Sequence, residues 1–406
     1  MWNLQKNDWA PRFGLAFRPF ADDKTVIRAG FGIFYNLLVD GNGISQLFRG
    51  IPFRTNQTFT NTPTQLIATW ANPYPSSTVS VGGYTPNGVN YNLKSGNVQQ
   101  YSLGVERQLT RDLILEVTYL GSKADHLPLS YNLNQPVPGP GPIQSRRPYP
   151  QWGSISWVDS IGFSTYNSLS ARLERRYTNG LSLLASWTWS HSIDDGGLGD
   201  SGDGEVAGIQ DPRNIVASNK GSSPFDIRQR FVVSLVYQLP FGSGKKFGAD
   251  LPGYLRVPIS GWETTAIVTS SSGPPFSITT TTDLSNTGAS TRPFVVGNPN
   301  LSNPTPTEWF NTAAFSLALP AGTYSYGNVG RNTQRADGVQ NIDFGLFRNF
   351  AIRERLNLQF RAEIFNLFNH ADFGLPIGNI NASNFGQVTQ TSNPSREIQF
   401  SVKVVF

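Results

Sequence analysis

Residues 397–406 read EIQFSVKVVF, and this stretch decides how the rest of the chain is interpreted. Every second residue from Ile398 to Phe406 is apolar, and the residues between them are polar or charged except Val405. Successive side chains of a β-strand point to opposite faces of its sheet. The stretch therefore predicts a strand with one fully apolar face.

The same alternation of apolar and polar residues recurs along the whole chain. In each run the apolar positions carry no charge, whereas the positions between them carry charges of both signs. The pattern predicts an all-β, antiparallel protein with eleven strands. They lie at residues 12–18, 25–35, 100–106, 113–119, 169–174, 182–190, 230–238, 262–269, 342–346, 356–364 and 397–406.

The composition excludes several other classes of protein. The 406 residues include 40 Gly, 28 Pro and no Cys, and only 15% are charged, against roughly 25% in soluble domains. Without Cys, disulfide scaffolds and Cys-based metal centres are impossible. No apolar run approaches the 20 or so residues of a membrane helix. The net charge is +5, but Lys and Arg are scattered, so we expect no nucleic-acid surface.

Strand length and loop length both indicate a membrane barrel rather than a soluble sandwich. Many runs keep their period for nine or more residues, close to the 9–11 that a tilted strand needs to cross a bilayer. Short connections alternate with long ones, as in outer-membrane barrels, where short turns are periplasmic and long loops extracellular. The short connections lie at 21–23, 109–111, 178–180 and 351–354, with 240–258 a longer member on the same side, and the long ones at roughly 36–96, 121–163, 191–227, 271–339 and 369–395.

In a transmembrane barrel, one face of each strand meets lipid and the other meets the lumen. Strands cross hydrocarbon only in closed barrels, because every backbone polar group must be paired there. The apolar set of each strand then meets lipid, with aromatic residues near the strand ends suited to interfacial girdles. The opposite set meets the lumen, and its charged members are Arg28, Glu106, Glu116, Arg172, Glu174, Arg230, Arg361, Glu363 and Lys403.

The strand count predicts that the chain is part of a larger barrel. With short turns in the periplasm, the last of eleven strands ends inside, and the first begins outside. Bacterial single-chain barrels have even strand numbers, so we expect strands upstream of this chain. Residues 1–5 also lack the pattern of a secretory signal. Eleven is half of the 22 strands of outer-membrane transporters. Residues 1–406 are accordingly expected to be the C-terminal part of one outer-membrane β-barrel domain.

Several sequence motifs resemble those of a known family. Residues 7–19 read NDWAPRFGLAFRP, residues 186–195 read SWTWSHSIDD, and residues 361–370 read RAEIFNLFNH. Together with TVIRAGFGIFY at 25–35 and YNSL at 166–169, they resemble TonB-dependent receptors, more narrowly the Oar-like branch common in acidobacteria. The terminal Phe406 resembles the signal that the barrel assembly machinery reads. The resemblance covers essentially the whole chain.

The resemblance implies a 22-stranded barrel in the outer membrane of a Gram-negative-type cell, with its C-terminus in the periplasm. It also implies an N-terminal plug, absent from these residues, and uptake of a bulky extracellular ligand energised by the TonB complex. The expected partners are thus outer-membrane lipid and lipopolysaccharide, TonB, the plug and the assembly machinery. The main alternative is a structural or adhesive surface barrel without energised transport. An open porin and a soluble β-rich enzyme are further alternatives.

Two clusters in the loops could carry chemistry. Residues 194–205 concentrate five carboxylates among glycines, and calcium favours such oxygen clusters, although the spacing does not fit an EF-hand. The candidate ligands are Asp194, Asp195, Asp200, Asp203 and Glu205. His191 lies beside two of them, yet no nucleophile motif accompanies it. We therefore expect no enzymatic activity and no cofactor.

Overall fold

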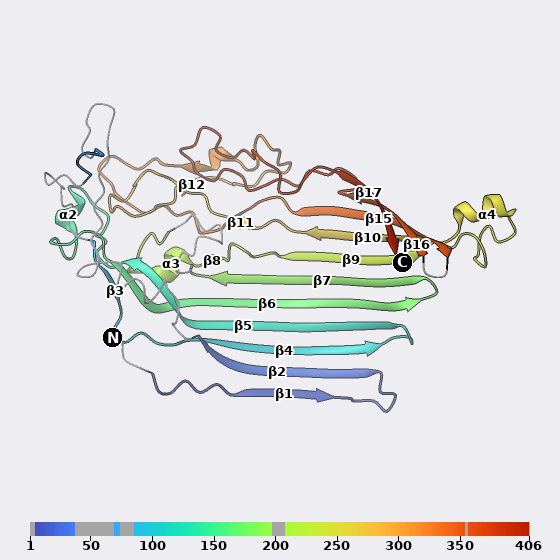
Figure 1. Cartoon of the computed structure of the whole chain (residues 1–406). Coiled ribbons are helices and arrows are strands. Elements are labelled where there is room, and N and C mark those ends of the chain that lie inside the picture. The colour runs from blue at the N-terminus through green and yellow to red at the C-terminus, as the bar shows by residue number, and fades with distance from the viewer. Residues whose placement is uncertain (1–4, 37–68, 74–84, 197–207, 354–355, 406) are drawn as a thin grey trace.

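The computed structural model describes residues 5–36, 69–73, 85–196, 208–353 and 356–405, and its main element is one large antiparallel sheet (Figure 1). Within these residues, eleven strands follow one another edge to edge in chain order, with β1 and β17 at the two ends. The strands are β1 (Arg12–Phe17), β2 (Thr25–Asn36), β4 (Gly96–Gln108), β5 (Leu113–Asn132), β6 (Ser156–Thr178), β7 (Leu181–Asp194), β9 (Gln229–Gln238), β10 (Trp262–Ser271), β15 (Val339–Arg353), β16 (Leu356–Phe365) and β17 (Glu397–Val405).

Short elements fill the connections between these strands. Two of them join the main sheet and bring it to thirteen strands: β3 (Asn87–Val89) pairs with β6, and β8 (Gly221–Ser222) pairs with β7. The described helices are too short or too polar to cross a membrane. The remaining elements are the pairs β11 (Pro275–Phe276) with β14 (Gln334–Arg335) and β12 (Phe294–Val295) with β13 (Phe315–Ser316), and the helices α2 (Ile143–Arg146), α3 (Ile215–Asn219), α4 (Gly253–Ile259) and η1 (Thr312–Ala314).

Short and long connections lie at opposite ends of the sheet (Figure 1). The tightest turn joins β6 to β7, where Thr178 pairs with Leu181 around Asn179 and Gly180. Both central residues have positive φ, 53° and 78°. An Asn-Gly pair adopts this type I′ conformation readily, and its twist matches that of the flanking strands. We call this end, which also carries α4, the short-turn end, and the other the long-loop end.

The pairing register collects the predicted apolar sets of all eleven strands on one face, which we call the apolar face. One row of partners across it consists of Leu15, Ala29, Leu103, Tyr119, Leu169 and Trp189. Large apolar side chains on this face are strongly exposed, including Leu103 at 52%, Trp189 at 53% and Phe400 at 69%. A soluble sheet buries such a surface, so its exposure is typical of a face that meets lipid.

Two strands are much longer than the alternation indicates. β5 has 20 residues and β6 has 23, so both run far into the segment 121–163 that the sequence assigns to a loop. Their extensions are mostly half-buried or buried on both faces, where polar and apolar residues mix. The alternation of apolar and polar residues therefore ends before the strands β5 and β6 end.

β15 is also longer than expected and brings a charge onto the apolar face. Arg348 pairs opposite Trp262 and Phe360, outside the predicted run 342–346. Its guanidinium donates to the carbonyls of Val257 and Pro258 at the end of α4, at 2.5 and 2.6 Å. Arg348 is only 8% exposed, since Trp262 and α4 cover it at the short-turn end.

The connections at the long-loop end fold together into a compact unit, which we call the cap. The cap comprises the described residues 208–228, 272–338 and 366–396. Its core is apolar and aromatic, with Phe310 in edge contact with Phe315 and Phe385. The buried members of this core are Phe276, Ile278, Phe310, Ala314, Phe315, Val329 and Ala336.

Candidate functional site

All nine charged residues assigned to the lumen share the face opposite the apolar one, which we call the polar face. Five of them form a continuous band over β2, β4, β5 and β6. Arg28 donates to Glu106 at 2.7 Å, and Glu106 pairs opposite Glu116 in the register. Arg172 lies 3.7 Å from Glu116 and 2.6 Å from Glu174. Each acidic residue of the band therefore has a cation beside it.

The other four predicted residues lie on the second half of the sheet and do not form ion pairs within the described residues. Arg361 donates to Gln359 at 2.6 Å and lies over the Phe347 ring. Glu363 and Lys403 pair opposite uncharged residues of neighbouring strands. Arg230 lines a hollow of about 210 Å³ below the cap, together with Tyr166 and Asp226. The polar face thus has mixed signs throughout, but only its first half forms a connected network.

One buried arginine, Arg292, holds loops of the cap together, and a second, Arg331, joins the cap to the end of β7. Arg292 is 2% exposed and donates to the carbonyl of Val329 and to Asn219 at the end of α3. Arg331 is 1% exposed and donates to the carbonyls of Asn219 and Asp194, and its guanidinium pairs with the Asp194 carboxylate. Buried charge is tolerated only with such complete hydrogen bonding. The two arginines thus contact partners 73 and 137 residues away in the chain.

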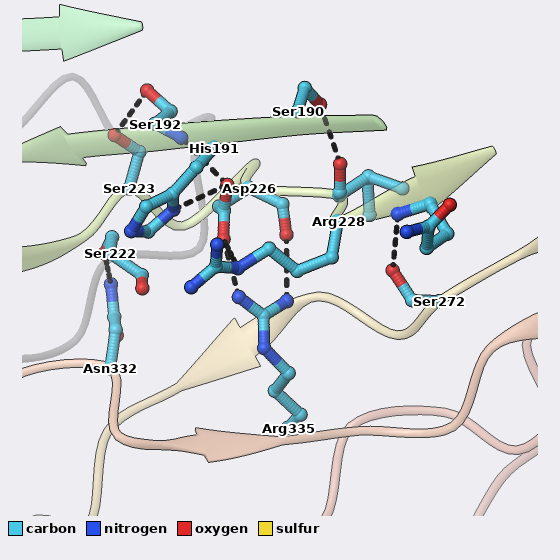
Figure 2. Close-up of polar contacts among 12 residues, drawn as sticks. Ser190, His191, Ser192, Ser222, Ser223, Asp226, Arg228, Ser272, Asn332 and Arg335 are labelled. Carbon is cyan, nitrogen blue, oxygen red and sulfur yellow. Dashed lines mark hydrogen bonds and ion pairs between the residues drawn. The ribbon is translucent and has the colours of Figure 1, made fainter. Parts of the chain in front are cut away.

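A third cluster centres on Asp226, whose side chain is 1% exposed (Figure 2). One carboxylate oxygen accepts from the Ser192 N–H at 2.7 Å and lies 3.2 Å from His191 Nδ1. The other pairs with Arg335 and lies 3.3 Å from Arg228 Nε. Burial alone would raise the pKa of Asp226, but the bonds from Ser192, Arg335 and His191 outweigh it and lower that pKa below its ordinary value.

The carboxylates proposed as calcium ligands have protein partners where the structure describes them. Asp194 pairs with Arg331, and Asp195 accepts the Phe163 N–H at 3.0 Å. Asp195 is fully buried, which raises the pKa of its carboxyl, and its Oδ2 has no hydrogen-bond partner among the described residues. In that part of the chain no group of three potential metal ligands comes together. Asp200, Asp203 and Glu205 lie outside the described residues.

Sequence reasoning missed the residues that organise the cap, namely Asp226, Arg292, Arg331 and Arg335. Only one signal pointed to the three arginines, and none pointed to Asp226. Residues 284–336 contain three Arg and a single acidic residue, Glu308, in a segment otherwise free of charge. Isolated arginines beside apolar runs such as PFVV at 293–296 are typical of a buried guanidinium that binds backbone carbonyls.

Comparison with known proteins agrees with this architecture. Residues 1–399 match the model of a family described as outer membrane beta barrel domain. No curated protein matches the chain. The outer membrane transporter YddB of Escherichia coli has a similar fold, with a TM-score of 0.50 and 11% identity. The match covers 97% of this chain and 40% of YddB.

Two further solved structures show weaker likeness. A mutant of the ferric enterobactin receptor PfeA of Pseudomonas aeruginosa gives a TM-score of 0.47 at 14% identity over 98% of this chain and 40% of its own. The ferric-catecholate import receptor Fiu of E. coli gives 0.44 at 11% identity over 97% and 34%. The chain therefore spans about two fifths or less of the solved structures that it matches.

Proposed function

The chain belongs to the outer membrane beta barrel domain family, and from that premise we propose that it forms part of a TonB-dependent receptor that takes up a bulky ligand. In this proposal the eleven strands are one half of a 22-stranded barrel, and they make the C-terminal part of its wall. The plug and the segment that contacts TonB belong to the rest of the polypeptide. The sequence motifs that resemble the Oar-like branch support this assignment.

The observation that carries the proposal is the two-faced, eleven-stranded sheet. Its exposed apolar face suits lipid, and its polar face suits a water-filled or plugged lumen. Both outer strands, β1 and β17, pair on one side only within the described residues. Unpaired strand edges are costly in hydrocarbon, so further strands would have to complete the wall.

The orientation follows from the connections. We place the short-turn end in the periplasm and the cap outside the cell, as in other outer-membrane barrels. Val405, the last described residue, then lies on the periplasmic side, next to the proposed assembly signal Phe406 (Figure 1).

The charges on the polar face favour docking of a plug over ion selection. A selective pore carries a ring of one sign, whereas this face carries both signs in one band, on Arg28, Glu106, Glu116 and Arg172. The cap would capture the ligand, and movement of the plug on TonB would release it into the lumen. No bond of the ligand is broken in this mechanism, so the protein acts as a receptor and transporter rather than an enzyme.

An antibody against residues 396–406 tests the proposal in fractions of the source cells. We expect a band far above 44.6 kDa in the outer membrane, and chemical crosslinking of that species to TonB. A band near 44.6 kDa in the same fraction, with no crosslink to TonB, would instead favour a surface barrel without energised transport.

A further inference from the structure

A groove of about 320 Å³ opens on the apolar face where β5, β6 and β7 approach the cap. Its apolar wall consists of Tyr119, Leu169 and Trp189, which are partners in one row of the register. Its other end is formed by His191 and Arg228. Trp189 is 53% exposed, and the side chains of Arg228 and His191 are 41% and 30% exposed. The groove is therefore open to whatever surrounds the apolar face.

The floor of the groove is a fixed arrangement of polar and aromatic groups. The Tyr119 hydroxyl donates to Asn167 Oδ1 at 2.7 Å, and the Tyr101 hydroxyl approaches the same atom at 3.4 Å. Tyr101 lies directly over Gly121, where a Cβ atom would come within 2.1 Å of its ring. The glycine thus lets the Tyr101 ring lie flat on the sheet beside the groove.

The basic end of the groove has more positive than negative charge. Arg228 and His191 share the carboxylate of Asp226 with a second guanidinium, that of Arg335 (Figure 2). Asp226 is buried behind them and has hydrogen bonds on both oxygens. Among the described residues, one carboxylate faces two guanidiniums, so one positive charge has no acidic partner, and Arg228 brings part of it to the groove.

The depth of the groove matches the boundary of a membrane. Trp189 is eight residues from Leu181 at the start of β7. At roughly 3.3 Å per residue and a tilt of about 40°, this is about 20 Å along the barrel axis. The apolar band of an outer-membrane barrel is about 25 Å tall. His191 and Arg228 therefore lie at the level of lipid headgroups, and Leu169 lies at the level of acyl chains.

We propose that this groove binds one phosphate-bearing lipid of the outer leaflet, with an acyl chain against Tyr119, Leu169 and Trp189 and the phosphate on Arg228 and His191. The proposal rests on the assignment of the apolar face to lipid made above. A zwitterionic lipid fits the apolar wall equally well but does not satisfy the surplus charge. The site should therefore prefer a lipid with a net negative headgroup.

The test is native mass spectrometry of the protein extracted from outer membranes, freed of lipid and mixed with equal amounts of phosphatidylglycerol and phosphatidylcholine of the same chain length. We expect the wild type to retain phosphatidylglycerol preferentially. The double variant Arg228→Gln/His191→Gln should lower the ratio of the two bound lipids about fivefold or more. Arg228→Lys, which keeps the charge, should retain most of the preference.

A charge-matched control lies at the other end of the sheet. Arg111 is exposed in the turn between β4 and β5, so Arg111→Gln should leave the lipid ratio unchanged. Folding of every variant is checked by its heat-dependent shift in gel mobility. An unchanged ratio in the double variant, or an equal fall in Arg111→Gln, would overturn the proposal.

A second measurement separates failure of the groove from failure of the proposed barrel. Leu103 lies at the centre of the apolar face, and the chain has no Cys of its own. In Leu103→Cys, a membrane-impermeant maleimide should not react in intact outer membranes. Labelling of this residue would contradict the assignment of the face to lipid. If the maleimide does not react with Leu103→Cys but the double variant has an unchanged lipid ratio, only the proposed lipid site in the groove is contradicted.

Discussion

On the polar face, Arg28 and Arg172 are at least half exposed and pair with carboxylates of neighbouring strands, whereas Arg292 and Arg331 in the cap are buried and donate largely to backbone carbonyls. The sheet is held by its ladder of backbone hydrogen bonds, so its charges contribute little to stability. The cap has only short strands, and its loops depend on a few guanidiniums to satisfy their carbonyls. The same residue type is therefore replaceable in one region and structural in the other.

The largest expected effect comes from removing a buried arginine of the cap. Arg331→Met leaves the carbonyls of Asn219 and Asp194 and the Asp194 carboxylate without this donor. Breaking a buried ion pair on one side costs about 3–5 kcal/mol. We expect rapid proteolysis and hydrogen exchange in the cap while the sheet remains protected. Arg172→Met is the matched control, and it should cost about 1 kcal/mol or less. Equal rates of proteolysis in the two variants would contradict the difference between the two regions.

A charge on the apolar face should destabilise the sheet by a similar amount. Leu103→Lys places a cation near the middle of the proposed bilayer span, at a cost of about 2–4 kcal/mol. Gln100→Lys, on the same strand but exposed on the polar face, should cost far less. Urea unfolding in lipid vesicles measures both. Equal midpoints would show that both faces meet water.

The Asp226 cluster makes the stability of the cap depend on pH. The pKa of Asp226 is lower in the folded protein than its ordinary value near 3.9. The cluster therefore contributes its full stability above about pH 4 and loses it as the pH falls through the folded pKa. Asp226→Asn should remove about 1.5–3 kcal/mol at neutral pH and flatten the acid dependence of cap proteolysis. An unchanged acid profile in this variant would assign the dependence to other carboxyls.

The smallest effect is expected for the exposed pair on the polar face. A double-mutant cycle of Arg28→Ala and Glu106→Ala should give a coupling free energy of about 0.2–1 kcal/mol, despite the short distance of 2.7 Å between the charged groups. Salt should reduce it further. Unfolding measurements on the four proteins give this value. A coupling above about 2 kcal/mol would mean that the polar face is shielded from water.

The strands of the sheet could be predicted because one face of each is uniformly apolar. All eleven runs, from residues 12–18 to residues 397–406, fall within or largely overlap a strand of the structure. The predicted strands are too short where neither face of the strand is uniformly apolar. The outer halves of β5 and β6 have neighbours on both faces, so their side chains no longer alternate.

The cap and the charge on β15 could not be predicted for a related reason. Arg348 lies on the apolar face because α4 supplies carbonyls for it, and that contact joins separate segments. Asp226, Arg292 and Arg331 likewise have partners far away in the chain. A local pattern carries no information about such partners. From the sequence, Asp194 and Asp195 belong to a carboxylate cluster in a loop, whereas in the structure one pairs with Arg331 and the other is buried.

In the orientation proposed above, the length of β6 determines how far this part of the wall projects outward from the membrane. Its 23 residues span about 75 Å along the strand, or roughly 55 Å along the barrel axis at a tilt near 40°. Only about 25 Å of this is needed to cross the hydrocarbon. In the orientation proposed above, the remaining 30 Å or so projects beyond the outer leaflet and carries the connection between β5 and β6, which includes α2. Antibodies against the connection between β5 and β6 should therefore bind to intact cells in that orientation.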